Sequence, residues 1–263
     1  MIDNNEKQQR SIADSSGFPL QLRVAEVVKK SSNWKLKLEE HPWRSTNSEG
    51  FIDIVAQKAE DHLFQIMVFE CKRVRQAAWV FLIPQMAPSK YTHVRLFDSQ
   101  HSDARWERFD WHSDWEANPE SYESKYCSVP GQEQGRRNLL ERTAAEIAEA
   151  TEALAHQEKA LTDTGDTSNL ELTRIYIPVI VTTADLAVAH FEPGSVSLQD
   201  GCLPHDTRFV GVPYVRFRKA LTTEIEIRGM SSISKEHARS ERTIFVVNAE
   251  ELANFLEAWE IGP

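Results

Sequence analysis

The chain has few cysteines, no long apolar run and no phosphate-cradling glycine loop, and each absence excludes a class of protein. Its three cysteines, Cys71, Cys127 and Cys202, are widely spaced in a chain of 263 residues, so they form neither a disulfide framework nor a zinc motif. No apolar stretch approaches the ~20 residues that a membrane-spanning helix needs. The missing glycine loop argues against a nucleotide-binding phosphoryl enzyme. We therefore expect a protein of the reducing cytoplasm, outside the membrane.

Basic residues are outnumbered by acidic ones. The 40 Asp and Glu residues against 30 Lys and Arg give a net charge of −10. A general DNA-binding protein is usually basic, because contacts with phosphates dominate its affinity. A cluster of basic residues nevertheless lies in the N-terminal third, and it suits either a local basic face or an ordinary solvated surface. It consists of Lys29, Lys30, Lys35, Lys37, Lys72, Arg73 and Arg75. We expect binding to nucleic acid to be weak or to depend on a partner.

Composition and order suggest one domain behind a short leader. Residues 1–17 are polar and lack the apolar core of a secretory signal, so we predict a disordered leader. Apolar content of 41% and charged content of 27% are those of an ordinary globular protein. No composition break or internal repeat divides residues 18–263. We expect a single domain there, with a core over about 18–184 and a C-terminal extension over 185–263.

Hydrophobic periodicity predicts a helix, three strands, a second helix and a buried strand, followed by further strands. The expected helices are 18–31 and 136–161. The expected strands of this core are 33–39, 51–56, 63–69 and 173–184. A further short strand is expected over 79–83, and residues 41–50 read as a polar loop. After residue 184 we expect strands over 185–191, 212–221 and 242–249 and a helix that closes the chain.

Residues 98–135 are the least regular part of the sequence, and aromatic side chains are frequent in them. They include Trp106, Trp111, Trp115, Tyr122 and Tyr126. These aromatics suit stacking on unpaired bases, but pinning an irregular insertion to the core is the interpretation that we favour. Near residue 217, Arg216 and Arg218 alternate with apolar neighbours. They suit either a basic stripe in a substrate groove or the outer face of a half-exposed strand.

The strongest functional pattern lies in residues 50–73, GFIDIVAQKAEDHLFQIMVFECKR. A strand carries Asp53, a short polar turn follows, and an apolar strand runs directly into Glu70, Cys71 and Lys72. Side chains alternate along a strand, so Glu70 and Lys72 project from the same face. Two carboxylates hold a hard divalent cation, and a nearby ammonium orients water or offsets charge on a phosphate. An ordinary surface hairpin with a cross-strand ion pair places the same residue types here, but the apolar context favours a site.

These residues resemble the core motif of the PD-(D/E)XK nuclease superfamily, in which an aspartate at a strand end precedes Glu-x-Lys on the next strand. The resemblance implies an α/β fold with a restriction-endonuclease-like αβββαβ core and a mixed sheet, here extended by C-terminal strands and a final helix. It also implies metal binding by Asp53, Glu70 and the Cys71 carbonyl, and catalysis by Asp53, Glu70 and Lys72. In such proteins the first helix often adds an acidic residue. Here Glu26 and Gln21 are the alternatives, and an exposed charge is the simpler interpretation of Glu26.

The expected function is therefore a Mg²⁺-dependent endonuclease, with Mn²⁺ as an alternative cofactor. Its substrate would be nucleic acid, and DNA is the expected one. Arg73 and Arg75 would contact the nucleic acid. By analogy with the superfamily, its role would be in defence or repair. The rival hypothesis is a catalytically silent module with the same fold that acts as an interaction or nucleic-acid-sensing subunit. A homodimer or a protein partner is compatible with either hypothesis.

Overall fold

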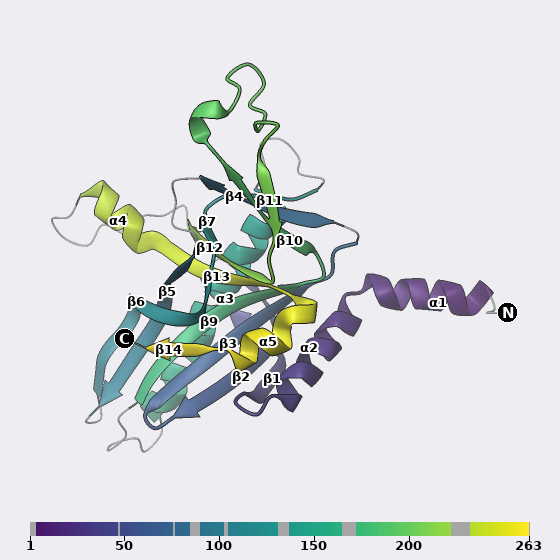
Figure 1. The fold of residues 1–263 in the computed structure, drawn as a ribbon. Coiled ribbons are helices and arrows are strands. Elements are labelled where there is room, and N and C mark those ends of the chain that lie inside the picture. Colours follow the sequence, from purple (N-terminus) through teal and green to yellow (C-terminus); the bar gives the residue numbers. More distant parts are fainter. Residues whose placement is uncertain are drawn as a thin grey trace.

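The protein has a mixed α/β fold, seen in a computed structural model that describes residues 4–46, 48–75, 77–84, 90–102, 105–130, 137–164, 172–221 and 232–262. Within those ranges the chain forms five α helices and two β sheets, one of ten strands and one of four (Figure 1). The α/β class and the mixed sheet expected from the sequence are confirmed.

The larger sheet is mixed, with parallel strands at its centre and antiparallel pairs beside them. Its path is β1–β2–β3–β9–β13–β12–β7, and β5, β6 and β14 join beside it. The strands are β1 (Lys35–Arg44), β2 (Glu49–Glu60), β3 (Leu63–Lys72), β5 (Tyr91–Ser102), β6 (Arg105–Ser121), β7 (Glu123–Ser124), β9 (Leu172–Thr182), β12 (Tyr214–Ala220), β13 (Glu241–Asn248) and β14 (Glu260–Gly262). β1, β2 and β3 are successive antiparallel neighbours, whereas β9 runs parallel to β3. A parallel step requires a crossover, and helix α3 (Leu139–Thr164) lies in that connection.

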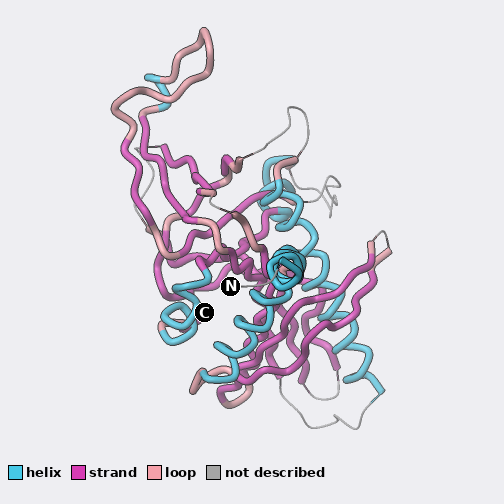
Figure 2. Tube along the Cα trace, turned by 90° about the vertical axis from the view of Figure 1, so that its right-hand side faces the viewer, coloured by secondary structure: helices cyan, strands magenta, loops and turns pink. Residues whose placement is uncertain are grey.

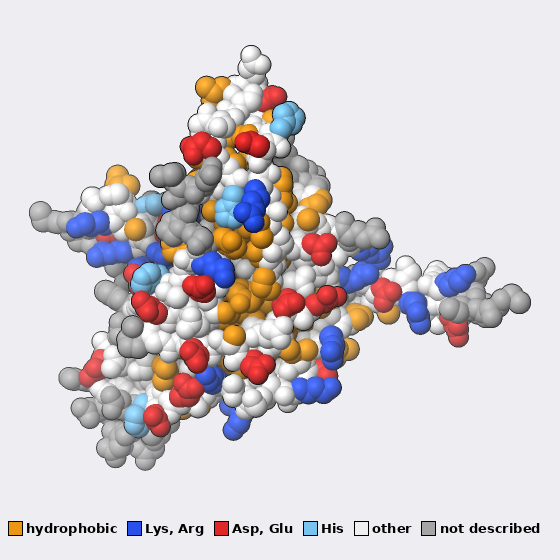
Figure 3. Space-filling model, in the orientation of Figure 1, with side chains coloured by type: hydrophobic (Ala, Val, Ile, Leu, Met, Phe, Trp, Pro, Cys, Tyr) orange, Lys and Arg blue, Asp and Glu red, His pale blue; other side chains and the backbone are white. Residues whose placement is uncertain are grey.

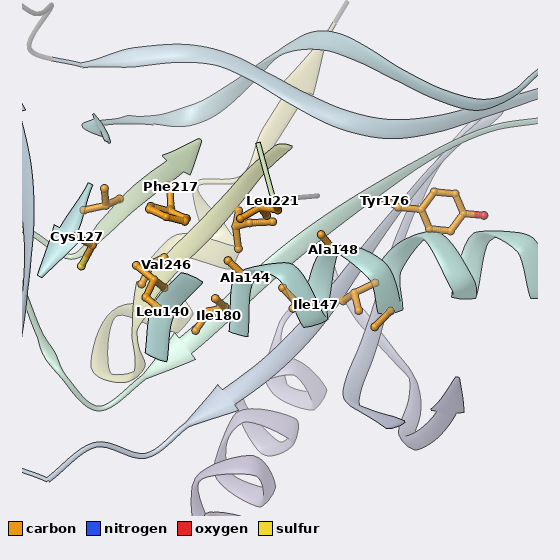
Figure 4. Packing of buried hydrophobic residues seen from close by; sticks show 14 of the residues in the cluster. Cys127, Leu140, Ala144, Ile147, Ala148, Tyr176, Ile180, Phe217, Leu221 and Val246 are labelled. Carbon is orange, nitrogen blue, oxygen red and sulfur yellow. The ribbon is translucent and has the colours of Figure 1, made fainter. Parts of the chain in front are cut away.

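Helices pack on both faces of the larger sheet (Figure 1). On one face, α2 (Phe18–Lys30) and α5 (Leu252–Glu257) contribute to a core with Ile54, Met67 and Phe69. On the other face, α3 packs its alanine- and leucine-rich stripe against β9, β12 and β13 (Figure 4). Buried on both faces, β9 is a nearly continuous apolar strand, as expected for a central parallel strand.

The smaller sheet has the order β11–β10–β4–β8. Its strands are β4 (Ala78–Pro84), β8 (Cys127–Ser128), β10 (Asp185–Phe191) and β11 (Arg208–Gly211). Trp79 and Phe81 of β4 are fully buried in the same core cluster as α3, so the two sheets share one core. The β10–β11 hairpin, with the short 3₁₀ helix η1 (Pro193–Ser195) in its loop, projects away from the body (Figures 1 and 2). Hydrophobic side chains gather near its base (Figure 3).

Most predicted elements are confirmed with modest changes of boundary. The helices expected at 18–31 and 136–161 are α2 and α3, and the buried strand expected at 173–184 is β9. The strands expected at 51–56 and 63–69 are the cores of β2 and β3, which extend to a tight turn in which Asp61 has φ of 48°. The strands expected over 79–83, 185–191, 212–221 and 242–249 are β4, β10, β12 and β13.

Two predictions about irregular segments are wrong. In place of a disordered leader, residues 4–15 form helix α1 (Asn4–Ser15), which is exposed and rich in the helix formers Glu, Lys, Gln and Arg. In place of a polar loop over 41–50, β1 continues to Arg44 and buries Trp43, and β2 begins at Glu49. The closing helix is confirmed as the short 3₁₀ helix η2 (Ala249–Glu251) followed by α5, and a short strand that was not predicted, β14, follows it and pairs with β6.

The segment expected to be irregular over 98–135 is also regular for most of its length. β5 and β6 form a long antiparallel hairpin that pairs with one end of β9. Aromatic side chains attach this hairpin to the core, which is the interpretation favoured from the sequence. Trp106 packs edge-on against Phe109. Tyr122 packs against the core cluster on the α3 face, and Trp115 packs against the cluster on the α2 face. Tyr126 is exposed, and the side chain of Trp111 and all of residues 103–104 and 131–136 lie outside the described residues.

Arg216 and Arg218, for which a basic stripe in a groove and the outer face of a half-exposed strand were the alternatives, do not face a groove. Arg216 is fully buried, and it donates hydrogen bonds to the carbonyls of Ala117 and Pro119. Arg218 lies in an acidic environment, with its Nε 3.0 Å from Glu241 Oε2. Both guanidinium groups contact the fold itself: Arg216 reaches the backbone of β6, and Arg218 reaches Glu241 at the start of β13.

A partly buried charged cluster also holds α3 to the sheet beside helix α4 (Ile233–Ser240). Glu152 of α3 contacts Arg242 Nε at 3.0 Å and His112 Nε2 at 3.1 Å. Burial opposes the charge of Glu152, but these two partners outweigh it and lower the pKa of Glu152 to about 2. None of the helices in the described part of the chain is long and apolar enough to cross a lipid bilayer.

Candidate active site

The end of the β2–β3 hairpin brings Asp53 and Cys71 together. The antiparallel ladder between β2 and β3 ends at the pair Ile54 and Phe69. One residue further along, the Asp53 side chain takes the place of a backbone partner: its Oδ2 accepts a hydrogen bond of 2.7 Å from the Cys71 N–H. The carboxylate is therefore fixed at the point where the two strands separate.

Glu70 and Lys72 lie at the end of β3 and project from the same face of the strand, as the sequence predicts. Their side chains form an ion pair with Lys72 Nζ 2.6 Å from Glu70 Oε1. Both are only partly accessible, at 20% for Glu70 and 29% for Lys72. The parallel ladder with β9 continues through Glu70 and Lys72, where they lie opposite Ile180 and Thr182. Because β9 is a central buried strand, it holds this end of β3 rigidly.

The two carboxylates at this point are hard to ionise together. Burial, followed by the charge of Asp53, raises the pKa of Glu70 from 4.5 to about 6, and Lys72 only partly offsets this. Burial also raises the pKa of Asp53, against the opposing effects of the Cys71 N–H bond and Lys72. Close carboxylates in a desolvated place favour either a proton or a cation. The site therefore has the electrostatics of a cation site.

The pKa of Lys72 is higher than that of an ordinary lysine. Burial opposes its charge, but Glu70, then Glu146 and Asp53, outweigh the burial and raise the pKa of Lys72. At neutral pH this side chain is an ammonium group that donates hydrogen bonds. The arrangement suits a residue that orients water or offsets phosphate charge better than one that accepts a proton.

Cys71 presents its backbone and not its sulfur to the site. Burial, with the charges of Asp53 and Glu70, raises the pKa of the Cys71 thiol well above its ordinary value, so the sulfur stays protonated. The Cys71 N–H points towards β2, where it meets Asp53. In an extended strand the N–H and C=O of one residue point to the same side. The Cys71 carbonyl therefore faces the same edge as the Asp53 carboxylate.

Helix α2 contributes Gln21 to this site and not Glu26. Gln21 Nε2 donates to the Asp53 carbonyl at 3.3 Å and also to a carboxylate oxygen of Glu40. Glu26 is exposed and pairs with Lys30 on its own helix at 3.0 Å. The simpler interpretation of Glu26 is thus confirmed, and the question of which residue approaches the site is answered in favour of Gln21.

Two acidic residues near the site are not identified by the sequence pattern. Glu40 of β1 has φ of 52°, a backbone conformation that is uncommon outside glycine and often marks functional sites. Its charge contributes to the raised pKa of Asp53. Glu146 of α3 acts in the same way on Glu70. Glu146 is one acidic residue among many in an exposed helical pattern, and Glu40 lies at a strand irregularity, so neither carries a local signal in the sequence.

The remaining predicted contacts lie close by or are already paired. Arg73 and Arg75 are exposed directly after β3, next to Lys72 in the chain. In the basic cluster, Lys29 pairs with Glu39 at 3.0 Å and Lys30 pairs with Glu26. The other members, Lys35 and Lys37, line an open groove of about 430 Å³ on the β1–β2 hairpin.

The donor set fits a magnesium ion. Within the described residues, no group of three or more His, Cys, Asp and Glu side chains gathers closely enough to hold a metal. Two carboxylates and a carbonyl remain, and Mg²⁺ typically uses one or two carboxylates while it keeps several waters. The raised pKa values of Asp53 and Glu70 indicate a place where a cation would relieve repulsion between charges.

No protein-family model matches the chain, and neither the curated proteins nor the solved structures that were compared with it gave a match.

Proposed function

We propose that this protein is a Mg²⁺-dependent nuclease that hydrolyses phosphodiester bonds in nucleic acid, with DNA as the expected substrate. The observation that supports this most is the convergence of Asp53, Glu70 and Lys72 at the end of β3, where burial and mutual repulsion raise the pKa of Glu70 to about 6. A structural ion pair at a hairpin end would need one carboxylate and one ammonium. The second, half-buried carboxylate, Asp53, accepts a hydrogen bond from the Cys71 N–H, and a cation would offset the charge that it adds beside Glu70.

The order of elements supports a restriction-endonuclease-like core within this proposal. Helix α2, the antiparallel strands β1, β2 and β3, helix α3 and strand β9 follow one another in the αβββαβ order, with β9 parallel to β3. Strands β4 to β8 are an insertion between β3 and α3 in this view. The insertion and the C-terminal strands both add to the sheets, and Glu70 and Lys72 at the end of β3 stay partly accessible.

Each residue of the site has a distinct role in the proposed reaction. The carboxylates of Asp53 and Glu70 and the carbonyl of Cys71 would hold the metal. Bound Mg²⁺ supplies charge that polarises the phosphoryl group and lowers the pKa of a water molecule. Lys72, held as an ammonium group, orients the attacking water and offsets charge on the phosphate. Arg73 and Arg75, exposed beside it, would contact neighbouring phosphates.

One observation favours the rival function, a silent module that binds without cutting. Glu40 and Glu146 add negative charge around the site, and the whole chain carries −10. Such surroundings weaken the approach of a phosphate backbone unless a metal or a partner protein offsets them. The nuclease remains the better proposal because two carboxylates beside a lysine are the groups that metal-assisted hydrolysis of a phosphodiester needs.

Purified protein incubated with plasmid, single-stranded DNA and RNA, with Mg²⁺, Mn²⁺ or EDTA, tests the proposal. We expect metal-dependent cleavage of at least one substrate and its loss on Asp53→Asn substitution. A Lys90→Ala variant, which removes a partly exposed lysine paired with Glu120 at 3.5 Å, controls for a general loss of positive charge. Absence of cleavage with every substrate and metal would favour the silent module.

A further inference from the structure

An open groove of about 430 Å³ lies at the start of β1, which is an edge strand of the larger sheet. β1 begins at Lys35, opposite Gln57, and β2 continues past this point to Glu60. Among the described residues that line the groove, Lys35, Lys37 and Lys58 are basic and only Glu60 is acidic. The groove therefore carries an excess of positive charge, although the whole chain has a net charge of −10.

Lys35 and Lys37 supply the charge of this groove that no acidic side chain offsets. Lys58 pairs with Glu60 at 2.8 Å, so these two charges neutralise each other. Lys35 and Lys37 are exposed, and neither forms an ion pair within the part of the chain that the structure describes. Most other lysines in that part have an acidic partner. Two exposed ammonium groups on one strand, without such partners, are suited to bind an anion.

The groove lies on the same side of the sheet as the candidate active site. Burial raises the pKa of Glu158 on α3, and the hydrogen bond from the Tyr176 hydroxyl and the charge of Lys37 oppose this. Glu146 of the same helix adds to the burial that raises the pKa of Glu70. Because α3 packs on one face of the sheet, Lys37 and Glu70 both belong to that side.

The carboxylates of the site lie between this groove and the basic residues that follow β3. Gln57 lines the groove four residues after Asp53 on β2, which is about 13 Å at the rise of a strand. Arg73 and Arg75 lie in the opposite direction, because β3 is antiparallel to β2 and the chain continues past Lys72. Phosphates of one strand of B-form DNA are spaced by about 3.4 Å along the axis, so 13 Å corresponds to about four nucleotides.

We propose that Lys35 and Lys37 bind the phosphate backbone of the nucleic-acid substrate, about four nucleotides from the phosphate that is cut. Lysine binds a phosphate as a point charge, and contacts to the backbone position the substrate without reading its sequence. With Arg73 and Arg75 on the other side of the metal ligands, the two lysines hold one strand across the site. This inference rests on the proposed nuclease function and names the surface that holds its substrate.

Equilibrium binding of fluorescein-labelled DNA and RNA, each as a duplex and as a single strand, tests the inference in Ca²⁺ in place of Mg²⁺ and over a range of salt concentration. Each phosphate contact that is lost makes the plot of log affinity against log salt shallower by about 0.9 for a duplex and about 0.7 for a single strand. The double variant Lys35→Gln, Lys37→Gln should therefore make the duplex slope shallower by about 1.8 and weaken binding at low salt on the order of tenfold.

Two control variants make the binding test specific. The double variant Lys35→Arg, Lys37→Arg keeps both positive charges, so it should retain the affinity and the salt slope of the wild type. Lys235→Gln removes an exposed lysine of α4 that has no ion pair in the described ranges. It should leave both quantities unchanged, because α4 does not line the groove.

Cleavage kinetics in Mg²⁺ separate the groove from the chemistry. The double glutamine variant should lower kcat/KM on the order of tenfold through KM, because the lysines hold substrate away from the reacting phosphate. A salt slope unchanged in this variant, or changed equally by Lys235→Gln, would overturn the groove, and metal-dependent cleavage by the wild type would still support the nuclease. A shallower slope in a protein that binds but never cuts would support the groove and contradict the nuclease. Failure of the wild type to bind or cut any of these nucleic acids would contradict both.

Discussion

The metal-free protein should lose stability as the pH rises through the titration of Glu70, and Glu70→Gln should remove that loss. Burial and Asp53 raise the pKa of Glu70 from 4.5 to about 6. Between these values the folded protein holds a proton that the unfolded chain has released, so the free energy of unfolding falls as the pH increases. The difference of 6 − 4.5 = 1.5 pKa units corresponds to a cost of about 2 kcal/mol, fully present above pH 6.

Urea denaturation in EDTA across this pH range measures the cost directly. Glutamine keeps the shape of Glu70 and still accepts a hydrogen bond from Lys72, but it does not titrate. The stability of Glu70→Gln relative to wild type should therefore increase by about 2 kcal/mol between pH 4.5 and pH 7. Glu257→Gln, which removes an exposed carboxylate from α5, controls for the loss of one negative charge.

Parallel stability profiles for wild type and Glu70→Gln would refute the electrostatic description of the site. Addition of Mg²⁺ at neutral pH provides a second comparison. An ion that binds only the folded state stabilises it in proportion to its affinity, so Mg²⁺ should stabilise the wild type more than Glu70→Gln. Equal stabilisation of the two would place the metal elsewhere.

Three further predictions concern the same site and its supports. Asp53→Asn should lower Mg²⁺ affinity by at least tenfold in calorimetry, because a neutral oxygen is a weaker ligand for a hard cation; unchanged affinity would contradict its assignment. Glu152→Gln should destabilise the protein by about 1–2 kcal/mol at pH 7, a value reduced for partial exposure, and the difference from wild type should disappear as the pH falls from 4.5 towards 2, where the folded carboxylate titrates. Gly50→Ala should cost about 1 kcal/mol in thermal denaturation because its Cβ would press on buried Trp43, whereas Gly211→Ala, which has open space around it, should not destabilise.

The parts of the fold that are predictable from sequence are those with one strong local signal. Helix α3 has a long run of good helix formers with an apolar stripe, and β9 is an uninterrupted buried strand. The pattern of apolar residues along the sequence identifies the strands that carry Asp53, Glu70 and Lys72. The three residues meet as predicted because the hairpin geometry is local and a short turn fixes the register.

The parts that sequence did not predict depend on contacts between distant segments. β6 reads as irregular because charged residues interrupt its aromatics, yet it forms a strand by pairing with β5 and β14. Arg216 reads as a surface residue, and only the coverage of β12 by β6 explains its burial. Helix propensity alone accounts for α1, which the polar composition concealed.

At the candidate site too, contacts between distant segments decide which further residues approach Asp53 and Glu70. The contact of Gln21 with Asp53 depends on how α2 packs on the sheet, and the approach of Glu146 depends on where α3 crosses it. Neither is encoded in a motif. Glu40 is identified by its backbone conformation, a property that the sequence of a non-glycine residue does not reveal.

The rate of Mg²⁺-dependent DNA cleavage by Lys72→Ala, measured beside wild type, tests the central claim most directly. Lys72 is part of the site but is not a proposed metal ligand, so the variant should fold and bind Mg²⁺ while its cleavage rate falls by a factor on the order of 10²–10³, as when a charge-stabilising donor is lost. Full cleavage by a folded Lys72→Ala protein would contradict the proposed mechanism.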